Sequence, residues 1–128
     1  MKYYNTKIVE YSFDEALQKV ADELKKEGFG VLTEIDVKET LKKKIDVDFR
    51  NYKILGACNP SFAHKALSAE ENIGVLLPCN FIVQENLDGK TQISSVNPTV
   101  SMQNVQNPNL EPIAKEVTEK LTRVMDNL

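Results

Sequence analysis

Apolar residues recur at helical spacing in the N-terminal part of the chain. Ser12 and Glu15 form a capping box at the start of this segment, and Gly28 suits the left-handed position that ends a helix. The apolar positions between them are Phe13, Ala16, Leu17, Val20, Ala21 and Leu24. The pattern predicts a helix between Ser12 and Gly28 with a strand on each side, at residues 2–10 and 29–35.

Two further segments have an apolar stripe at helical spacing. Residues 36–45 carry a thin stripe of three residues, Val37, Leu41 and Ile45, which can pack on only one neighbour. Residues 110–126 carry a fuller stripe, which predicts a closing helix. From the first and last helices we expect seven side chains to be buried against one face of a sheet: Phe13, Leu17, Val20, Leu24, Ile113, Val117 and Leu121.

The middle of the chain is dominated by apolar runs. Residues 52–57 place apolar side chains on both faces of a strand, Ile54 on one face and Leu55 and Ala57 on the other. This pattern favours an internal strand that is covered on both faces. Residues 73–83 form the longest apolar run, and we expect Pro78 to mark an edge, a bulge or a change of direction in it. If the alternation continues through Pro78, then Val75, Leu77, Cys79, Phe81 and Val83 share one face.

Turn residues define the end of this central region. Asp88 and Gly89 predict a tight turn that lets residues 91–96 pair antiparallel with residues 81–85. Residues 99–109 are polar and predicted to be flexible. The expected order is βαβαβαββα in one domain, residues 1–128. This order indicates an α+β fold with a largely antiparallel sheet and amphipathic helices packed against it.

Composition and charge narrow the class of protein. The net charge of −3 and the pI near 5.2 argue against a nucleic-acid-binding protein, whose affinity would depend on Lys and Arg. No apolar run approaches the roughly 18 residues of a membrane span, and the N-terminus lacks the apolar segment of a secretory signal. We therefore expect a cytoplasmic protein with no membrane or nucleic-acid partner. Nucleotide and dinucleotide motifs are absent, and we expect no cofactor.

The candidate chemistry gathers where predicted strands meet turns. Cys58 precedes Asn59, a suitable helix N-cap, and Pro60, a suitable first helical residue. A thiol at such a junction is either a small buried apolar residue or a reactive group whose thiolate the helix N-terminus stabilises. Cys79 lies in an apolar run, which favours a structural role.

The other candidates depend on proximity that sequence does not establish. His64 could act as a base for Cys58 only within hydrogen-bond reach, and an exposed helical histidine is usually inert. A disulfide between Cys58 and Cys79 is disfavoured in a cytoplasmic protein. A metal site built from Cys58, Cys79, His64 and Met102 would lack the paired spacing of known zinc sites, and we predict no metal. Asn80 is expected to satisfy backbone groups near Pro78.

Several motifs together resemble a known family. They are GACNP at residues 56–60, AHKAL at 63–67, IGVLLPCN at 73–80 with an Asp-Gly hairpin after it, and VNP at 96–98. The chain resembles the domain-of-unknown-function family 302 over nearly its whole length. The resemblance implies a small α+β domain of bacterial or archaeal origin. Because members of the family sometimes occur as tandem repeats, it is also compatible with a homodimer, but it implies no activity.

Two functional hypotheses follow. The favoured one is a non-catalytic, dimerising module that binds a small ligand or a protein partner around residues 58–60 and 78–80, with Cys58, Asn59, His64, Cys79 and Asn80 as candidate binding residues. The alternative is a thiol-dependent enzyme or redox protein that uses Cys58 and His64. A single histidine and the lack of a carboxylate cluster leave little general acid-base capacity, which favours the first hypothesis.

Overall fold

The fold was analysed in a computed structural model that describes residues 2–128. Its strands and longer helices are β1 (Tyr4–Val9), α1 (Phe13–Lys26), β2 (Gly30–Asp36), α2 (Val37–Ile45), β3 (Tyr52–Cys58), α3 (Pro60–Ala69), β4 (Cys79–Glu85), β5 (Thr91–Val96) and α5 (Glu111–Asp126). The shorter helical segments are η1 (Glu71–Leu76), α4 (Pro98–Ser101), η2 (Gln103–Val105) and η3 (Pro108–Leu110). The predicted order βαβαβαββα and the α+β class are confirmed.

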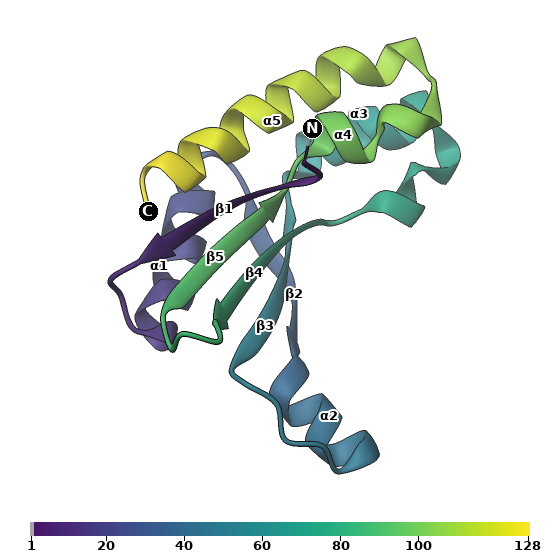
Figure 1. Ribbon diagram of the computed structural model, residues 1–128. Coiled ribbons are helices and arrows are strands. Elements are labelled where there is room, and N and C mark those ends of the chain that lie inside the picture. Colours follow the sequence, from purple (N-terminus) through teal and green to yellow (C-terminus); the bar gives the residue numbers. More distant parts are fainter. Residues whose placement is uncertain (1) are drawn as a thin grey trace.

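The strands form one sheet in the order β1-β5-β4-β3-β2, and each pair of neighbours is antiparallel. The predicted hairpin is present, with Phe81 opposite Ser95 and Gly89 in the left-handed region at φ 74°. Helices α1 and α5 lie on one side of this sheet, while α3 and α4 gather at one of its ends (Figure 1). The molecule is therefore a two-layer α+β structure.

Local signals set the ends of α1 as the sequence predicts. The Glu15 N–H donates to Ser12 Oγ at 3.2 Å, and Ser12 Oγ donates to the Glu15 carboxylate at the same distance. At the other end Gly28 has φ 82°, and the Phe29 N–H donates to the Leu24 carbonyl at 2.9 Å. These are the bonds of a Schellman motif, which turns the chain directly into β2.

The core lies between the sheet and the α1–α5 layer. Val20, Leu24, Val117 and Leu121 are buried, as predicted from the helical stripes. The other three predicted core residues pack against this core but are only partly buried: Phe13, Leu17 and Ile113. Within residues 2–128, no helix combines the length and apolar character needed to cross a lipid bilayer.

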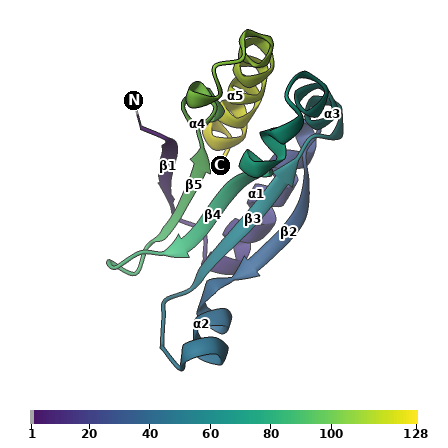
Figure 2. The same cartoon turned by 90° about the vertical axis from the view of Figure 1, so that its right-hand side faces the viewer.

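None of the helices in the described part of the chain covers the opposite face of the sheet (Figure 2). β3 is an internal strand between β2 and β4, as predicted, but the expectation that both its faces are covered is wrong. Leu55 and Ala57 are buried under the helices, whereas Ile54, which points the other way, stays half-buried. The apolar residues on the two sides of β3 therefore have different surroundings: one side packs in the core, and the other belongs to an uncovered apolar face of the sheet.

Helix α2 projects beyond the end of the sheet (Figure 1). Asp36 caps it by accepting from the Glu39 N–H at 2.9 Å. None of its residues is buried, and Ile45 is 62% exposed. Val47, in the connector between α2 and β3, is also exposed, so this part of the connector does not pack against the rest of the chain.

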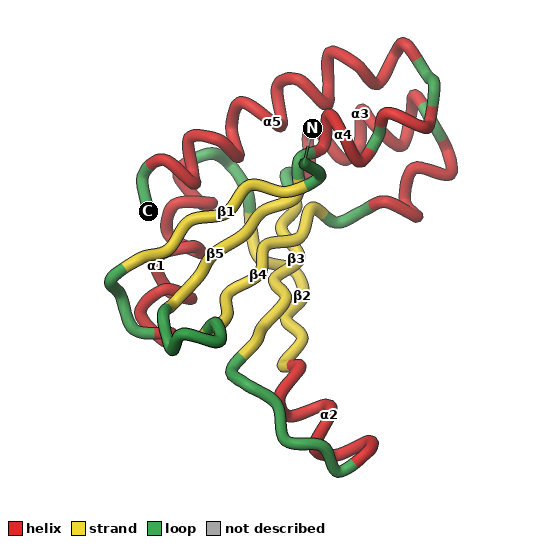
Figure 3. The backbone as a smooth tube through the Cα atoms, in the orientation of Figure 1, coloured by secondary structure: helices red, strands yellow, loops and turns green. Residues whose placement is uncertain are grey.

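Two segments differ from the sequence prediction (Figure 3). Residues 73–76 belong to the 3₁₀ helix η1 rather than to a strand, and β4 begins only at Cys79, after the cis peptide between Leu77 and Pro78. Val75 is therefore 85% exposed and does not share a face with Cys79. The segment predicted to be flexible, 99–109, instead forms short helical turns within α4, η2 and η3.

The core can be tested with two leucines of α1 that differ in burial. Leu24 is fully buried, so we expect Leu24→Ala to lower the free energy of unfolding by about 2–5 kcal/mol. Leu17→Ala should cost less, because the Leu17 side chain keeps part of its exposure. Urea unfolding followed by far-UV circular dichroism measures both, and an equal or larger loss in Leu17→Ala would contradict this core.

Candidate functional site

The site begins where β2, β3 and the residue before β4 approach closely around Gly56. A Cβ built on Gly56 would clash with Thr33 Oγ1 and lie 2.6 Å from Pro78 Cγ. Only glycine leaves room for both neighbours at this position. On the β2 side the register shifts between Val31 and Thr33, so Leu32 is an extra residue in a bulge and is 69% exposed.

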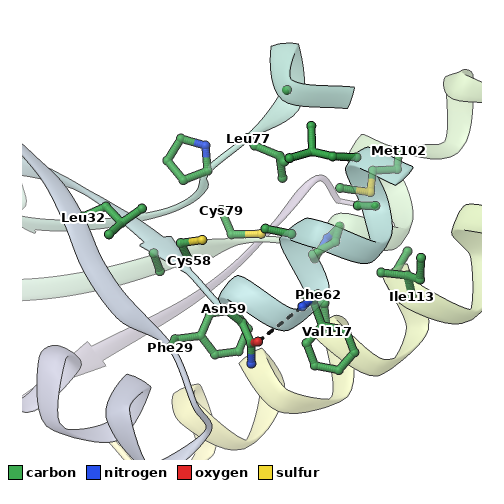
Figure 4. Close-up of a pocket in the computed structure, with 18 of the residues that line it drawn as sticks. Phe29, Leu32, Cys58, Asn59, Phe62, Leu77, Cys79, Met102, Ile113 and Val117 are labelled. Carbon is green, nitrogen blue, oxygen red and sulfur yellow. Dashed lines mark hydrogen bonds between the residues drawn. The ribbon is translucent and has the colours of Figure 1, made fainter. Parts of the chain in front are cut away.

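Beyond Gly56 lies a cavity of about 360 Å³. The ends of β3 and β4 form one wall, with Ala57 and Cys79 side by side in the sheet. Helices α3 and α5 form other walls, and Figure 4 shows Phe62, Ile113 and Val117 projecting toward the space. Leu32 and Leu67, both exposed, lie among the lining residues and mark its connection to solvent.

Small side chains explain why this space is not filled. The cavity lies between the main core and a smaller cluster around Ala66, Ile73 and Leu110, and Ile113 packs against both. Along its lining, Ala63, Ala66 and Ala114 stand where larger side chains would close it. In the part of the chain that the structure describes, no Asp, Glu, Lys, Arg or His lines the cavity.

Asn59 contacts both the start of α3 and the residue that ends α1, beside the cavity. Its Oδ1 accepts from the Phe62 N–H at 3.4 Å, which is the predicted N-cap of α3 (Figure 4). Its amide nitrogen lies against Gly28, where an added Cβ would be 3.1 Å from Nδ2. Asn59 is thus both a helix cap and part of the cavity wall.

Both cysteines line this cavity and both are free thiols. Because Ala57 pairs directly with Cys79, Cys58 is offset by one residue from Cys79, and their Cβ atoms leave the sheet on opposite sides. This register is unsuited to a disulfide between them. Figure 4 shows the two sulfurs at the same end of the cavity.

The two thiols differ in their surroundings. Cys79 is only 8% exposed, and its burial raises the pKa of its thiol to about 11, with the nearby Cys58 adding to the shift. Cys58 is half-buried at the strand-to-helix junction. Cys79 therefore stays protonated at neutral pH and acts as an apolar wall residue.

The remaining candidate residues lie elsewhere. His64 is on the exposed side of α3, outside the cavity lining, so it is not brought to Cys58. Asn80 is exposed on the uncovered sheet face, opposite Gly56 and on the same side of β4 as Ile82. Met102 does line the cavity, but among residues 2–128 no group of three His, Cys, Asp or Glu side chains is placed to hold a metal.

Sequence reasoning did not find most of the cavity wall. It missed Phe29, Phe62 and Val117 as site residues, because they are far apart in sequence and have the pattern of ordinary core positions, and it considered Met102 only as a possible metal ligand. The available signal was the pair of alanines on the apolar stripe of α3, Ala63 and Ala66, where a packed helix would carry larger side chains.

The fold and the cavity define a two-layer α+β domain with an apolar pocket at one end of its sheet. Comparison with known proteins places the chain in a family: it belongs to the family described as domain of unknown function DUF302, whose model matches residues 5–128. A crystal structure of the uncharacterized conserved protein DUF302 from Bacillus stearothermophilus is similar, with 31% sequence identity and a TM-score of 0.92. The match covers 99% of this chain and 98% of that one. No curated protein matches.

The contrast between the thiols predicts selective alkylation. Near neutral pH, iodoacetamide should label Cys58 well before Cys79, because the thiolate is the reactive form and Cys79 remains below its pKa of about 11. The Cys79 rate should rise about tenfold per pH unit up to that value. Peptide mass spectrometry of the wild type and of Cys58→Ala and Cys79→Ala measures both rates.

Equal labelling of the two thiols in the folded protein would contradict this description of the cavity. Protection of Cys58 until the protein unfolds would rule out its use as a nucleophile.

Proposed function

We propose that this protein is a non-catalytic binding domain that takes a small, uncharged, apolar ligand into the cavity beside residues 58–60 and 78–80. The observation that carries the proposal is the cavity lining, whose only ionisable side chains, within residues 2–128, are the thiols of Cys58 and Cys79. A charged ligand would lose its hydration there without gaining a counter-charge, at a cost of several kcal/mol.

The size of the cavity supports occupation. Ligand pockets commonly measure about 300–1,000 Å³, so 360 Å³ corresponds to a small molecule. An enclosed empty space of this volume would cost about 9 kcal/mol at roughly 24 cal/mol per Å³, which is comparable to the whole stability of a domain. An opening to solvent lowers this free-energy cost, and so does an apolar ligand that fills the cavity.

Thiol chemistry at Cys58 is the second candidate function, because Cys58 is half-buried on the wall of the same cavity. Its weakness is the missing base. The single histidine of the sequence is on the outer side of α3, and Cys79 is held protonated at neutral pH.

A matched pair of fluorescent probes tests the proposal. N-phenyl-1-naphthylamine is uncharged, and 8-anilinonaphthalene-1-sulfonate is the same molecule with a sulfonate added. We expect the uncharged probe to bind at least about tenfold more tightly, because none of the described residues gives the cavity a cationic side chain to pair with the sulfonate. Fluorescence titration of the folded protein measures both dissociation constants.

Variants on α3 locate the binding. Ala63→Trp places a large ring in the cavity and should abolish probe binding, whereas Ser61→Trp, on the exposed side of the same helix, should leave it unchanged. Tighter binding of the sulfonated probe, or equal binding to both variants, would contradict the proposed site.

A further inference from the structure

The uncovered face of the sheet carries a second set of exposed apolar side chains, separate from the cavity. Ile8 is 53% and Ile35 is 48% exposed, and they lie on the two edge strands β1 and β2. Between them, Ile54 and Ile82 are opposite each other on β3 and β4. From this surface we propose that two copies of the chain pair through these sheet faces to form a homodimer.

Charge is the first argument for a second copy. The outward positions of the described strands include no Asp, Glu, Lys or Arg, although 27% of the whole sequence is charged. They are Tyr4, Thr6, Ile8, Gly30, Thr33, Ile35, Tyr52, Ile54, Gly56, Cys58, Asn80, Ile82, Gln84, Gln92, Ser94 and Val96. In a two-fold dimer each surface meets an identical one, so an uncharged face avoids like-charge repulsion.

Several polar side chains on the β1, β5 and β4 part of this face are already paired within one chain. Thr6 Oγ1 accepts from Ser94 Oγ and from Gln92 Nε2, each at 3.0 Å, and donates to the Ile93 carbonyl at 3.3 Å. Asn86 Nδ2 donates to Gln92 Oε1 at 3.2 Å. Because these bonds are made before association, covering these four side chains does not cost them their hydrogen bonds.

Cationic side chains lie at the rim of the face, with Lys2 over the ring of Tyr4 at one edge. Arg50, from the connector before β3, donates to Gln84 Oε1 at 3.0 Å and lies over the rings of Phe49 and Tyr52. Charged groups at the rim are usual in interfaces whose centre is uncharged.

The area of the sheet indicates that α2 takes part. Five strands about 4.8 Å apart and about 20 Å long give a projected area of roughly 500 Å² per chain. A stable interface buries about 800 Å² per partner, so the sheet alone falls short. The α2 helix projects beyond the end of the sheet with Ile45 exposed and no residue buried, and it offers the additional apolar surface.

Light scattering after size-exclusion chromatography tests this dimer. At micromolar concentration the wild type should have twice the 14.5 kDa mass of one chain. Ile82→Lys puts two like charges at the centre of the interface, on the middle strand β4, and should weaken association at least about 100-fold. Thr122→Lys adds the same charge on the exposed side of α5 and should remain a dimer.

Ile8→Lys is the second variant, because Ile8 is exposed in a single chain and a lysine there does not need to be buried. It should also shift the protein toward the monomer. Uncharged-probe binding and circular dichroism should be unchanged in folded Ile82→Lys, which separates this proposal from the cavity proposal. A monomeric wild type overturns the dimer. An undiminished dimer in folded Ile82→Lys, or in Ile8→Lys where the first variant does not fold, overturns this interface.

Discussion

The close contact of three chain segments at Gly56 is the constraint on which the rest of the site depends. Thr33 from β2 and Pro78 before β4 occupy the space that a Cβ on Gly56 would need. Both residues therefore pack directly against β3 at this end of the sheet. After Pro78, β4 begins at Cys79, which pairs with Ala57. The contact at Gly56 also accompanies the bulge that puts Leu32 among the cavity-lining residues. A side chain at residue 56 would force these segments apart and so change the cavity.

The cavity itself results from a second constraint, the meeting of two hydrophobic clusters that do not fully merge. The main core fills the space between the sheet and helices α1 and α5. The smaller cluster around Ala66, Ile73 and Leu110 packs at the end of the sheet, with Ile113 reaching both. Alanines on α3 and α5 line the space between the two clusters, where larger side chains would fill it. The residues at the boundary between the two clusters therefore also line the cavity.

Local signals in the sequence predicted the elements well because their physics is local. The capping box of Ser12 and Glu15, the left-handed Gly28 and the N-cap Asn59 each act within a few residues, and the structure has all three. The failures concern long-range packing. The run containing Val75 and Cys79 looks continuous in sequence, yet a 3₁₀ helix and Pro78 divide it. The apolar residues of β3 predicted its place inside the sheet but not which of its faces is covered.

The candidate site was predicted only in part for the same reason. Cys58, Asn59 and Cys79 were identified from their junctions, and the structure brings them to one cavity. His64 was considered because it follows Cys58 closely in sequence, but the helical period turns it to the exposed side of α3. Met102 and Val117 line the cavity through contacts made across the fold, which no short motif encodes.

Diffraction from a xenon-pressurised crystal tests most directly whether this cavity is a preformed apolar binding site. Xenon enters dry apolar cavities and is not retained where polar groups hold ordered water. The account predicts a xenon peak among Cys79, Met102 and Val117, with the surrounding side chains unmoved. A cavity filled by hydrogen-bonded water, or closed by movement of α3 against α5, would contradict it.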